Sequence, residues 1–286
     1  MTSDRTNPDD LSGHQQEMFP RHVGYGGKKA AEIVGISYRQ LDYWARTDLV
    51  RPSVADATGS GSQRRYSYRY LFIPGTIGSI TWLAQNDDGI GRIRHGLVAA
   101  CAGDPGRLTY KRSRRGEAEI DRAAAHTLAH CGASYELLDF TPYGYDERQY
   151  ASPGYNLPVG SLTRTPNGRY PEYHTSADNL EFVRPECLAD TFARYVDILN
   201  LLENNKKYIN LNPKGEPQLG RRGLYGMFGG RKEAQSLEMA LLWVLNLSDG
   251  EHSLLDIAER AGLAFPVIQE AAGALFNAGL LQELAE

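Results

Sequence analysis

Residues 35–53, GISYRQLDYWARTDLVRPS, decide the fold of the N-terminal part of the chain. Ser37 caps a helix, and Gln40 three residues later completes a capping box. An apolar stripe just upstream breaks at Gly35, so two short helices meet at a glycine turn. Further on, GSGSQRRYSYR at residues 59–69 predicts a glycine-tipped hairpin with basic residues. Two helices followed by such a hairpin are typical of a winged helix-turn-helix.

The distribution of charge points the same way. The net charge is −4, but residues 21–70 carry nine Lys and Arg against four Asp and Glu, so this segment is +5 and the remainder is −9. A basic segment in an acidic chain favours contact with a polyanion. The pattern alone leaves a second interpretation open, a small helical cap whose basic residues are only solvated.

The same residues, from about Gly24 to Arg69, closely resemble the DNA-binding domain of the mercury-resistance-regulator (MerR) family. The resemblance implies that this segment binds double-stranded DNA. It assigns contacts to seven residues of the recognition helix and the wing: Tyr38, Arg39, Tyr43, Arg46, Arg64, Arg65 and Tyr66. Such regulators continue into a long dimerising helix, and this chain does not.

After Arg69 the pattern changes to short apolar runs that alternate with amphipathic segments, which is typical of an α/β sheet layer. Strands are expected at 70–73, 96–101, 135–140 and 157–162, and helices at 74–83, 117–130 and 185–203. On the last helix we expect five residues to face inward: Leu188, Phe192, Val196, Leu199 and Leu202. Helices at 239–247, 253–261 and 265–281 predict a second winged helix. The expected divisions are a disordered tail (1–22), the winged helix (23–69), the α/β domain (70–205), a linker (206–233) and the C-terminal winged helix (234–286).

Several longer motifs in this part, among them YRYLFIPGTIGSITWL, YGYDERQYASPGYNLPVGSLTRTP and YPEYHTSADNLEFV, resemble the second half of a bacterial aminopeptidase-like family of the zinc exopeptidase clan. The match runs from about Tyr66 to Glu286. With it, the expected fold class is α+β multidomain: an N-terminal winged helix-turn-helix, a central partial α/β layer like that of the zinc exopeptidases, and a C-terminal winged-helix unit.

A two-zinc hydrolase needs several metal ligands and a carboxylate general base. The resemblance puts the clan's first metal histidine and bridging aspartate upstream of the matched segment, where this chain has the DNA-binding module, and a glutamate where this chain has Gly75. It implies His174 as a metal ligand, with Asp104, or less favourably Cys101, near another ligand position. It places three further residues on a loop that faces the substrate in relatives: Asp146, Glu147 and Arg148.

His126 and His130 form an i, i+4 pair that could bind a metal ion. No HExxH glutamate accompanies them, so two surface histidines on an amphipathic helix are the favoured interpretation.

The sequence therefore predicts a DNA-binding regulator module fused to an aminopeptidase-like domain with no catalytic residues assigned. A zinc-dependent aminopeptidase-like hydrolase is the alternative, with zinc as its cofactor, and a fusion whose halves never acted together is a third hypothesis. Loss of the upstream strands would expose a sheet edge, so we expect a homo-oligomer or a partner chain. A polar N-terminus, no membrane span and three cysteines without a CxxC pair favour the cytoplasm.

Overall fold

The computed structural model describes residues 69–224 and 234–284. The chain divides into two compact units, Met1–Leu71 and Phe72–Glu286, and nearly all described residues belong to the second. The expected N-terminal winged helix and its DNA-contacting residues lie outside the described part. Within the described ranges, no helix is both long enough and apolar enough to span a membrane.

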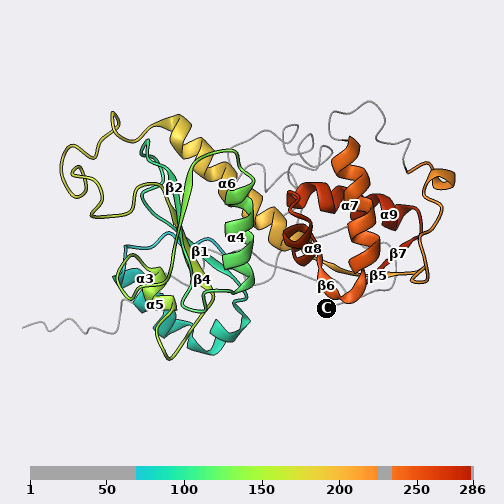
Figure 1. The fold of residues 1–286 in the computed structure, drawn as a ribbon. Coiled ribbons are helices and arrows are strands. Elements are labelled where there is room, and N and C mark those ends of the chain that lie inside the picture. The colour runs from blue at the N-terminus through green and yellow to red at the C-terminus, as the bar shows by residue number, and fades with distance from the viewer. Residues whose placement is uncertain (1–68, 225–233, 285–286) are drawn as a thin grey trace, which may run out of the picture. The chain divides into compact units, whose positions relative to one another are not determined.

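A four-stranded mixed sheet with the order β1-β4-β2-β3 forms the centre of the α/β layer (Figure 1). β1 (Gly96–Ala99) runs parallel to β4 (Val159–Thr163), and β2 (Leu108–Lys111) runs antiparallel to β4 and parallel to β3 (Tyr135–Leu138). All of β4 is buried, whereas β1 is only half-buried. β1 is therefore an edge strand of this sheet.

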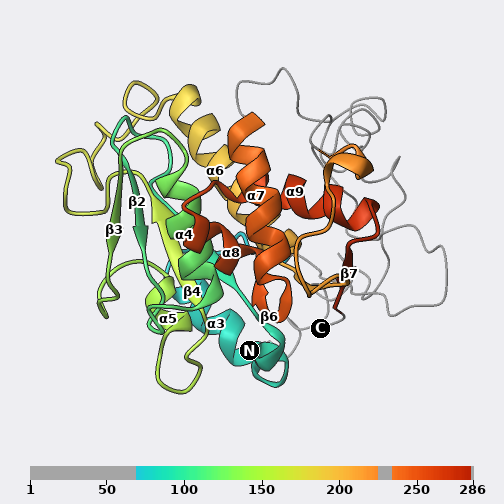
Figure 2. The same ribbon diagram turned by 45° about the vertical axis from the view of Figure 1, so that its right-hand side comes forward.

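Two helices, α4 (Glu119–Ala129) and α6 (Pro185–Asn204), cover one face of the sheet (Figures 1 and 2). Their apolar residues share a core with the strands: Leu108, Tyr110, Ile120, Leu128, Leu162, Ile198 and Leu201. The hydroxyl of Tyr195 on α6 donates to the carbonyl oxygens of Val98 (3.1 Å) and Leu162 (2.5 Å). One side chain thus holds α6 across both β1 and β4.

The opposite face carries α3 (Ile77–Gln85), the short helix η2 (Asp87–Arg92) and α5 (Glu147–Tyr150). A smaller core lies here: Leu83, Ile90, Tyr150, Leu157 and Val159. Side chains alternate along a strand, so Tyr110 points to the α4 face and the next residue, Lys111, points to this one.

The junction of β2 and α4 is built around Asp121, which is fully buried. Its carboxylate accepts from Tyr110 Oη (2.9 Å), Ser113 N (2.6 Å), Ser113 Oγ (2.6 Å) and Ala118 N (3.1 Å). The backbone donors include one at the start of α4, where a carboxylate also complements the helix dipole. Asp121 therefore joins the end of the strand to the first turn of the helix.

The C-terminal part combines three helices with a small antiparallel sheet of order β6-β5-β7. Its elements are β5 (Lys207–Asn210), η3 (Gly220–Arg222), α7 (Ala234–Leu247), β6 (Asp249–Ser253), α8 (Leu254–Ala261), α9 (Phe265–Asn277) and β7 (Leu281–Glu283). Ser253 caps α8 in a reciprocal box with Asp256. Gly262 ends that helix with φ +64°, a conformation that favours glycine.

Helix α4 also contacts the C-terminal part. Arg122 donates to Asp256 (2.6 Å) and Glu259 (2.5 Å) on α8. His126, one turn further along α4, is only 7% exposed and its Nε2 has no hydrogen-bond partner within the described ranges. The expectation that His126 and His130 are both surface residues is therefore wrong for His126, because α8 packs against this face of α4 and the sequence of α4 does not show that contact.

Several expected elements are confirmed in type and place, namely α3, β1, α4, β3, β4, α6, α7, α8 and α9. Residues 70–73 are not a buried strand, because Tyr70 and Phe72 are 72% and 96% exposed. The expected inward face of α6 is wrong for Leu188 and Phe192, whereas Leu202 packs against the core and Val196 and Leu199 are half-buried. Phe192 and Leu188 are exposed, and the buried positions are Thr191, Ile198 and Leu201, because the core contacts the other stripe of the helix.

Four strands were not expected from the sequence, namely β2, β5, β6 and β7. β2 is the LTYK at the start of LTYKRSRRGEAEIDRA. Because basic residues follow it directly, the stretch lacks the apolar run that would predict a strand. β5 lies in the stretch expected to be a linker, 206–233. Its backbone pairs with both β6 and β7, and its Tyr208 side chain is buried. That end of the expected linker therefore belongs to the C-terminal sheet.

We predict that Gly160→Ala destabilises the fold. A Cβ at position 160 would lie 2.1 Å from Tyr110 Oη, and that hydroxyl is fixed by Asp121. Overpacking of this kind costs about 1–3 kcal/mol. Chemical denaturation measures the loss. Gly273→Ala in α9 is the matched control, since nothing lies within 4 Å of its Cβ position and a helical alanine is favourable. Equal stability of the two variants would contradict the prediction.

We further predict that stability falls as the pH drops from about 6.5 to about 4. Burial, followed by the nearby His130, lowers the pKa of His126 to about 4. Between these pH values the unfolded chain binds a proton that the folded chain does not. The free energy of unfolding therefore falls by up to about 3 kcal/mol, and His126 causes no further loss below about pH 4. Urea titrations across the pH range measure this. His126→Phe should flatten the slope, and His130→Gln should leave most of it; an unchanged slope in His126→Phe would refute the assignment.

Candidate functional site

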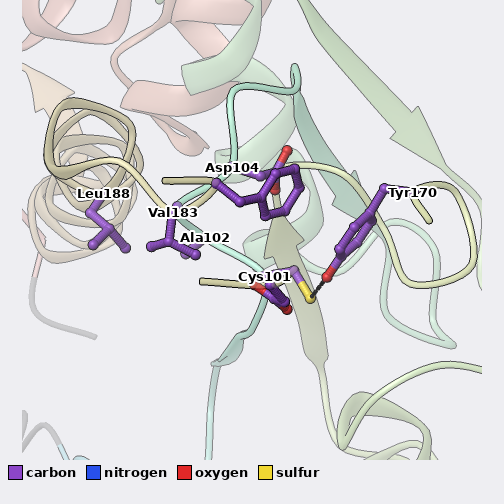
Figure 3. Close-up of a pocket in the computed structure, with 9 residues that line it drawn as sticks. Cys101, Ala102, Asp104, Tyr170, Val183 and Leu188 are labelled. Atoms are coloured by element: carbon purple, nitrogen blue, oxygen red, sulfur yellow. Dashed lines mark hydrogen bonds between the residues drawn. The ribbon is translucent and has the colours of Figure 1, made fainter. Parts of the chain in front are cut away.

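A pocket of about 260 Å³ opens at the carboxyl end of β1 (Figure 3). Three segments line it: the turn after β1, the loop that leads to α6, and the first turn of α6. The lining residues are Cys101, Ala102, Gly103, Asp104, Tyr170, Asp178, Phe182, Val183 and Leu188. Figure 3 shows Val183 and Leu188 on one side of the turn and Tyr170 on the other.

Asp104 holds the turn after β1 in place. It is 3% exposed, and its carboxylate accepts from Gly106 N (2.8 Å), Thr165 N (3.1 Å) and Thr165 Oγ1 (2.5 Å). A Cβ at Gly106 would lie 2.0 Å from Thr165 Oγ1, so only glycine allows this approach. The carboxylate thus ties the end of β4 to the floor of the pocket.

A second set of bonds joins the turn to α6. Arg164, 8% exposed, donates from Nε to Thr191 Oγ1 (2.9 Å) and from Nη1 to Gly106 O (2.7 Å), and it pairs with Asp190. Thr191 Oγ1 in turn donates to Ala102 O (2.8 Å). Because these groups are buried and bonded to one another, the pocket is preformed.

Cys101 is the reactive group in the pocket wall. Its backbone has φ +44°, which is unusual for a residue other than glycine, asparagine or aspartate. Its Sγ is hydrogen-bonded with Tyr145 Oη (2.7 Å) and Tyr170 Oη (3.2 Å). Burial, followed by the bond with Cys101, raises the pKa of both tyrosines, so both hydroxyls stay protonated at neutral pH.

Aromatic rings form a continuous wall beside the cysteine. Tyr170 stacks on Phe182 with centroids 5.3 Å apart and meets Tyr173 edge-on at 5.6 Å. Tyr173 stacks on His174 at 3.9 Å. The stretch YPEYHTSADNLEFV contains these rings, and its density of aromatic residues was the available signal for the wall, but sequence reasoning assigned a role only to His174.

The expected metal ligands do not gather into a metal site. His174 is exposed, and Asp104 already accepts three hydrogen bonds. Among residues 69–224 and 234–284, no three His, Cys, Asp or Glu side chains lie close enough together to hold a metal ion. The donor set therefore does not fit a zinc centre of the exopeptidase kind, which needs three or four ligands per metal.

The three residues expected to face a substrate take part in the fold, and none of them lines the pocket. Asp146 accepts from Thr76 N (2.6 Å) and Ser79 Oγ (2.5 Å) at the start of α3. Glu147 is fully buried, and its Oε1 lies 2.8 Å from Lys111 Nζ. Arg148 is half-buried, and its Nε has no partner within the described residues.

Three family models match the chain. Residues 49–205, more than half of the chain, match a domain of unknown function (DUF4910). Residues 25–71 match the MerR helix-turn-helix family of regulatory proteins, and residues 206–283 match a winged helix-turn-helix. The resemblances found in the sequence are thereby confirmed.

Individual relatives agree with this division. A Clostridium acetobutylicum protein named for polysaccharide biosynthesis and for an aminopeptidase-like domain is 53% identical over 218 residues, 76% of this chain and 50% of that protein. A crystal structure from C. acetobutylicum, named as a peptidase, has a TM-score of 0.71 and 44% identity, and covers 86% of this chain and 52% of that one. The chain thus spans about half the length of both.

The N-terminal segment has relatives of its own. An uncharacterized HTH-type transcriptional regulator of Mycobacterium tuberculosis is 61% identical over 51 residues, 18% of this chain and 23% of that protein. In a separate structural comparison, the chain matches a zinc aminopeptidase from Bacillus subtilis at 14% sequence identity with a TM-score of 0.36, over 45% of this chain and 33% of that one. The chain belongs to the DUF4910 family, and in it a MerR-type helix-turn-helix regulator module is fused to an aminopeptidase-like domain with a C-terminal winged helix.

Proposed function

We propose that this protein is a cytoplasmic transcriptional regulator that binds duplex DNA through its N-terminal module, and that its α/β domain does not hydrolyse peptides. The match of residues 25–71 to the MerR family is the observation that carries the proposal. The contacts assigned to the wing arginines Arg64 and Arg65 and to the recognition helix belong to the proposal.

The carboxylates of the α/β domain support the second half of the proposal. Asp104, Asp146 and Glu147 all bind groups within the fold. Gly75 stands where the family resemblance expects a glutamate, and its Cβ position lies 4.0 Å from Asp146 Oδ2. Glycine cannot transfer a proton, and Asp146 is already engaged at the start of α3. At this turn the described residues place the Asp146 carboxylate, and its Oδ1 already accepts from Thr76 and Ser79, which disfavours it as a general base.

Exposed apolar residues support association with a second chain. Four of them lie in the first segment of the described part: Tyr70, Phe72, Ile77 and Ile80. Among the described strands, the half-buried β1 pairs with β4 alone, and it carries no lysine or proline. We propose that the protein is a homo-oligomer or binds a partner chain through these groups.

We predict that DNA binding depends steeply on salt, because contacts with phosphate dominate the affinity of such modules. Fluorescence anisotropy with labelled duplexes of unrelated sequence, at about 50 mM and 200 mM salt, measures this. The double variant Arg64→Glu/Arg65→Glu should weaken binding to every duplex by at least about tenfold and reduce the salt slope by about 2.

The matched control is Arg114→Glu/Arg115→Glu, which reverses two adjacent exposed arginines of the α/β layer. It should leave the affinity unchanged. If the wing variant binds as tightly as the unaltered protein, the wing has no role; if no duplex is bound at low salt, the proposed function fails.

The assignment of His174 and Asp104 as metal ligands is tested by elemental analysis coupled to size-exclusion light scattering. Because Asp104 is engaged by Thr165 and Gly106, we expect no stoichiometric zinc. Because apolar side chains are exposed at the start of the described part, we expect a mass above that of a monomer. One or two zinc ions per chain, lost in His174→Ala, would instead favour the hydrolase. A sharp monomeric peak would refute the oligomer.

A further inference from the structure

We propose that the pocket after β1 binds a small, soft organic cation, of the quaternary ammonium class, as an effector. The inference does not depend on DNA binding, and the experiment below is carried out without DNA.

The charge of the lining selects the sign of the ligand. None of the nine lining residues is Lys, Arg or His, whereas two are aspartates. Asp104 accepts three hydrogen bonds, but the carboxylate of Asp178 forms no side-chain hydrogen bond or ion pair with any described residue. An anion in this pocket would meet the carboxylates of Asp104 and Asp178 and no basic side chain of the lining, so the lining disfavours anions.

The remaining lining groups select a soft cation over a strongly hydrated one. A primary ammonium needs several acceptors to replace its water, and the carbonyl oxygens of Cys101, Ala102 and Gly103 in the lining already accept hydrogen bonds. The lining also offers the stacked ring pair of Tyr170 and Phe182, a polarisable sulfur at Cys101, and the methyl groups of Val183 and Leu188. Aromatic faces attract quaternary ammonium groups, which are weakly hydrated. The ligand that fits has methyl groups on a positive nitrogen.

The size of the pocket limits the ligand as well. A volume of about 260 Å³ lies below the ~300–1,000 Å³ of pockets that hold drug-sized ligands, so a compact molecule fits. Asp104, Arg164 and Thr191 hold the turn after β1 in place, so little ordering of that side of the pocket is needed on binding. We therefore expect binding in the millimolar to micromolar range by a compact ligand.

Cys101 provides a built-in reporter, because its thiol lies in the pocket wall. The full-length protein is alkylated with iodoacetamide, and the rate at each cysteine is followed by peptide mass spectrometry. Cys131, which lies after α4 and outside the pocket, is the internal reference. The probes are choline and 3,3-dimethylbutan-1-ol, its neutral isostere with carbon in place of nitrogen, together with ethanolamine.

Choline should slow alkylation of Cys101 and not of Cys131, with an affinity at least about fivefold above that of either other probe. Asp178→Asn and Phe182→Leu should each weaken choline about two- to fivefold. Glu181→Gln, on the same loop but outside the lining, is the control and should change nothing.

The proposal fails if choline gives no protection at millimolar concentrations. It also fails if choline and its neutral isostere protect equally, because the charge would then play no part. Protection by choline that survives Asp178→Asn and Phe182→Leu unchanged would place the binding elsewhere and refute the pocket. A protein that binds DNA but not choline would leave the proposed function intact.

Discussion

The buried carboxylate of Asp121 is the interaction on which the α/β layer depends. It accepts four hydrogen bonds from the end of β2, the following loop and the start of α4, so it sets where the helix begins and how it meets the sheet. The next residue, Arg122, joins α4 to α8. Loss of the carboxylate would leave several buried donors without partners, at about 1–3 kcal/mol each.

Other acidic residues of the domain follow the same principle. A buried carboxylate is tolerated when hydrogen-bond donors or a cation contact it. Asp104 and Asp146 accept from several donors, and Glu147 pairs with Lys111 through Oε1, while its Oε2 has no partner among the described residues. Around Asp256, burial raises the pKa, but bonds from Ser253 and Arg122 outweigh that effect and lower it. Such groups hold loops and helix ends in place, and this occupation leaves them poorly suited to bind a metal ion or transfer a proton.

The sequence predicts best where a local pattern is sufficient. The helix expected at 253–261 is found as α8, which Ser253 and Asp256 cap, and the apolar period of α4 placed Ile120, Ala124 and Leu128 in the core. The first part of the expected inward face of α6 was wrong, because Leu188 and Phe192 have the apolar character of core residues. The stripe that packs there includes Thr191 and Tyr195, whose hydroxyls bind backbone carbonyls. A polar residue that is buried because it bonds to a distant segment does not add to the helical period of apolar residues from which a buried face is predicted. The pocket was missed for the same reason, since its lining comes from three segments up to 87 residues apart.

Helix α6 also has a mechanical consequence. Its 20 residues form a rod of about 30 Å, with Leu188 at the pocket end. At the far end Leu201 packs in the same core as α7, α8 and α9. A lever of that length turns a tilt of about 2° at one end into a displacement of about 1 Å at the other. A change beside Leu188 that tilted the helix by this amount would move its far end within the core shared with the C-terminal winged helix.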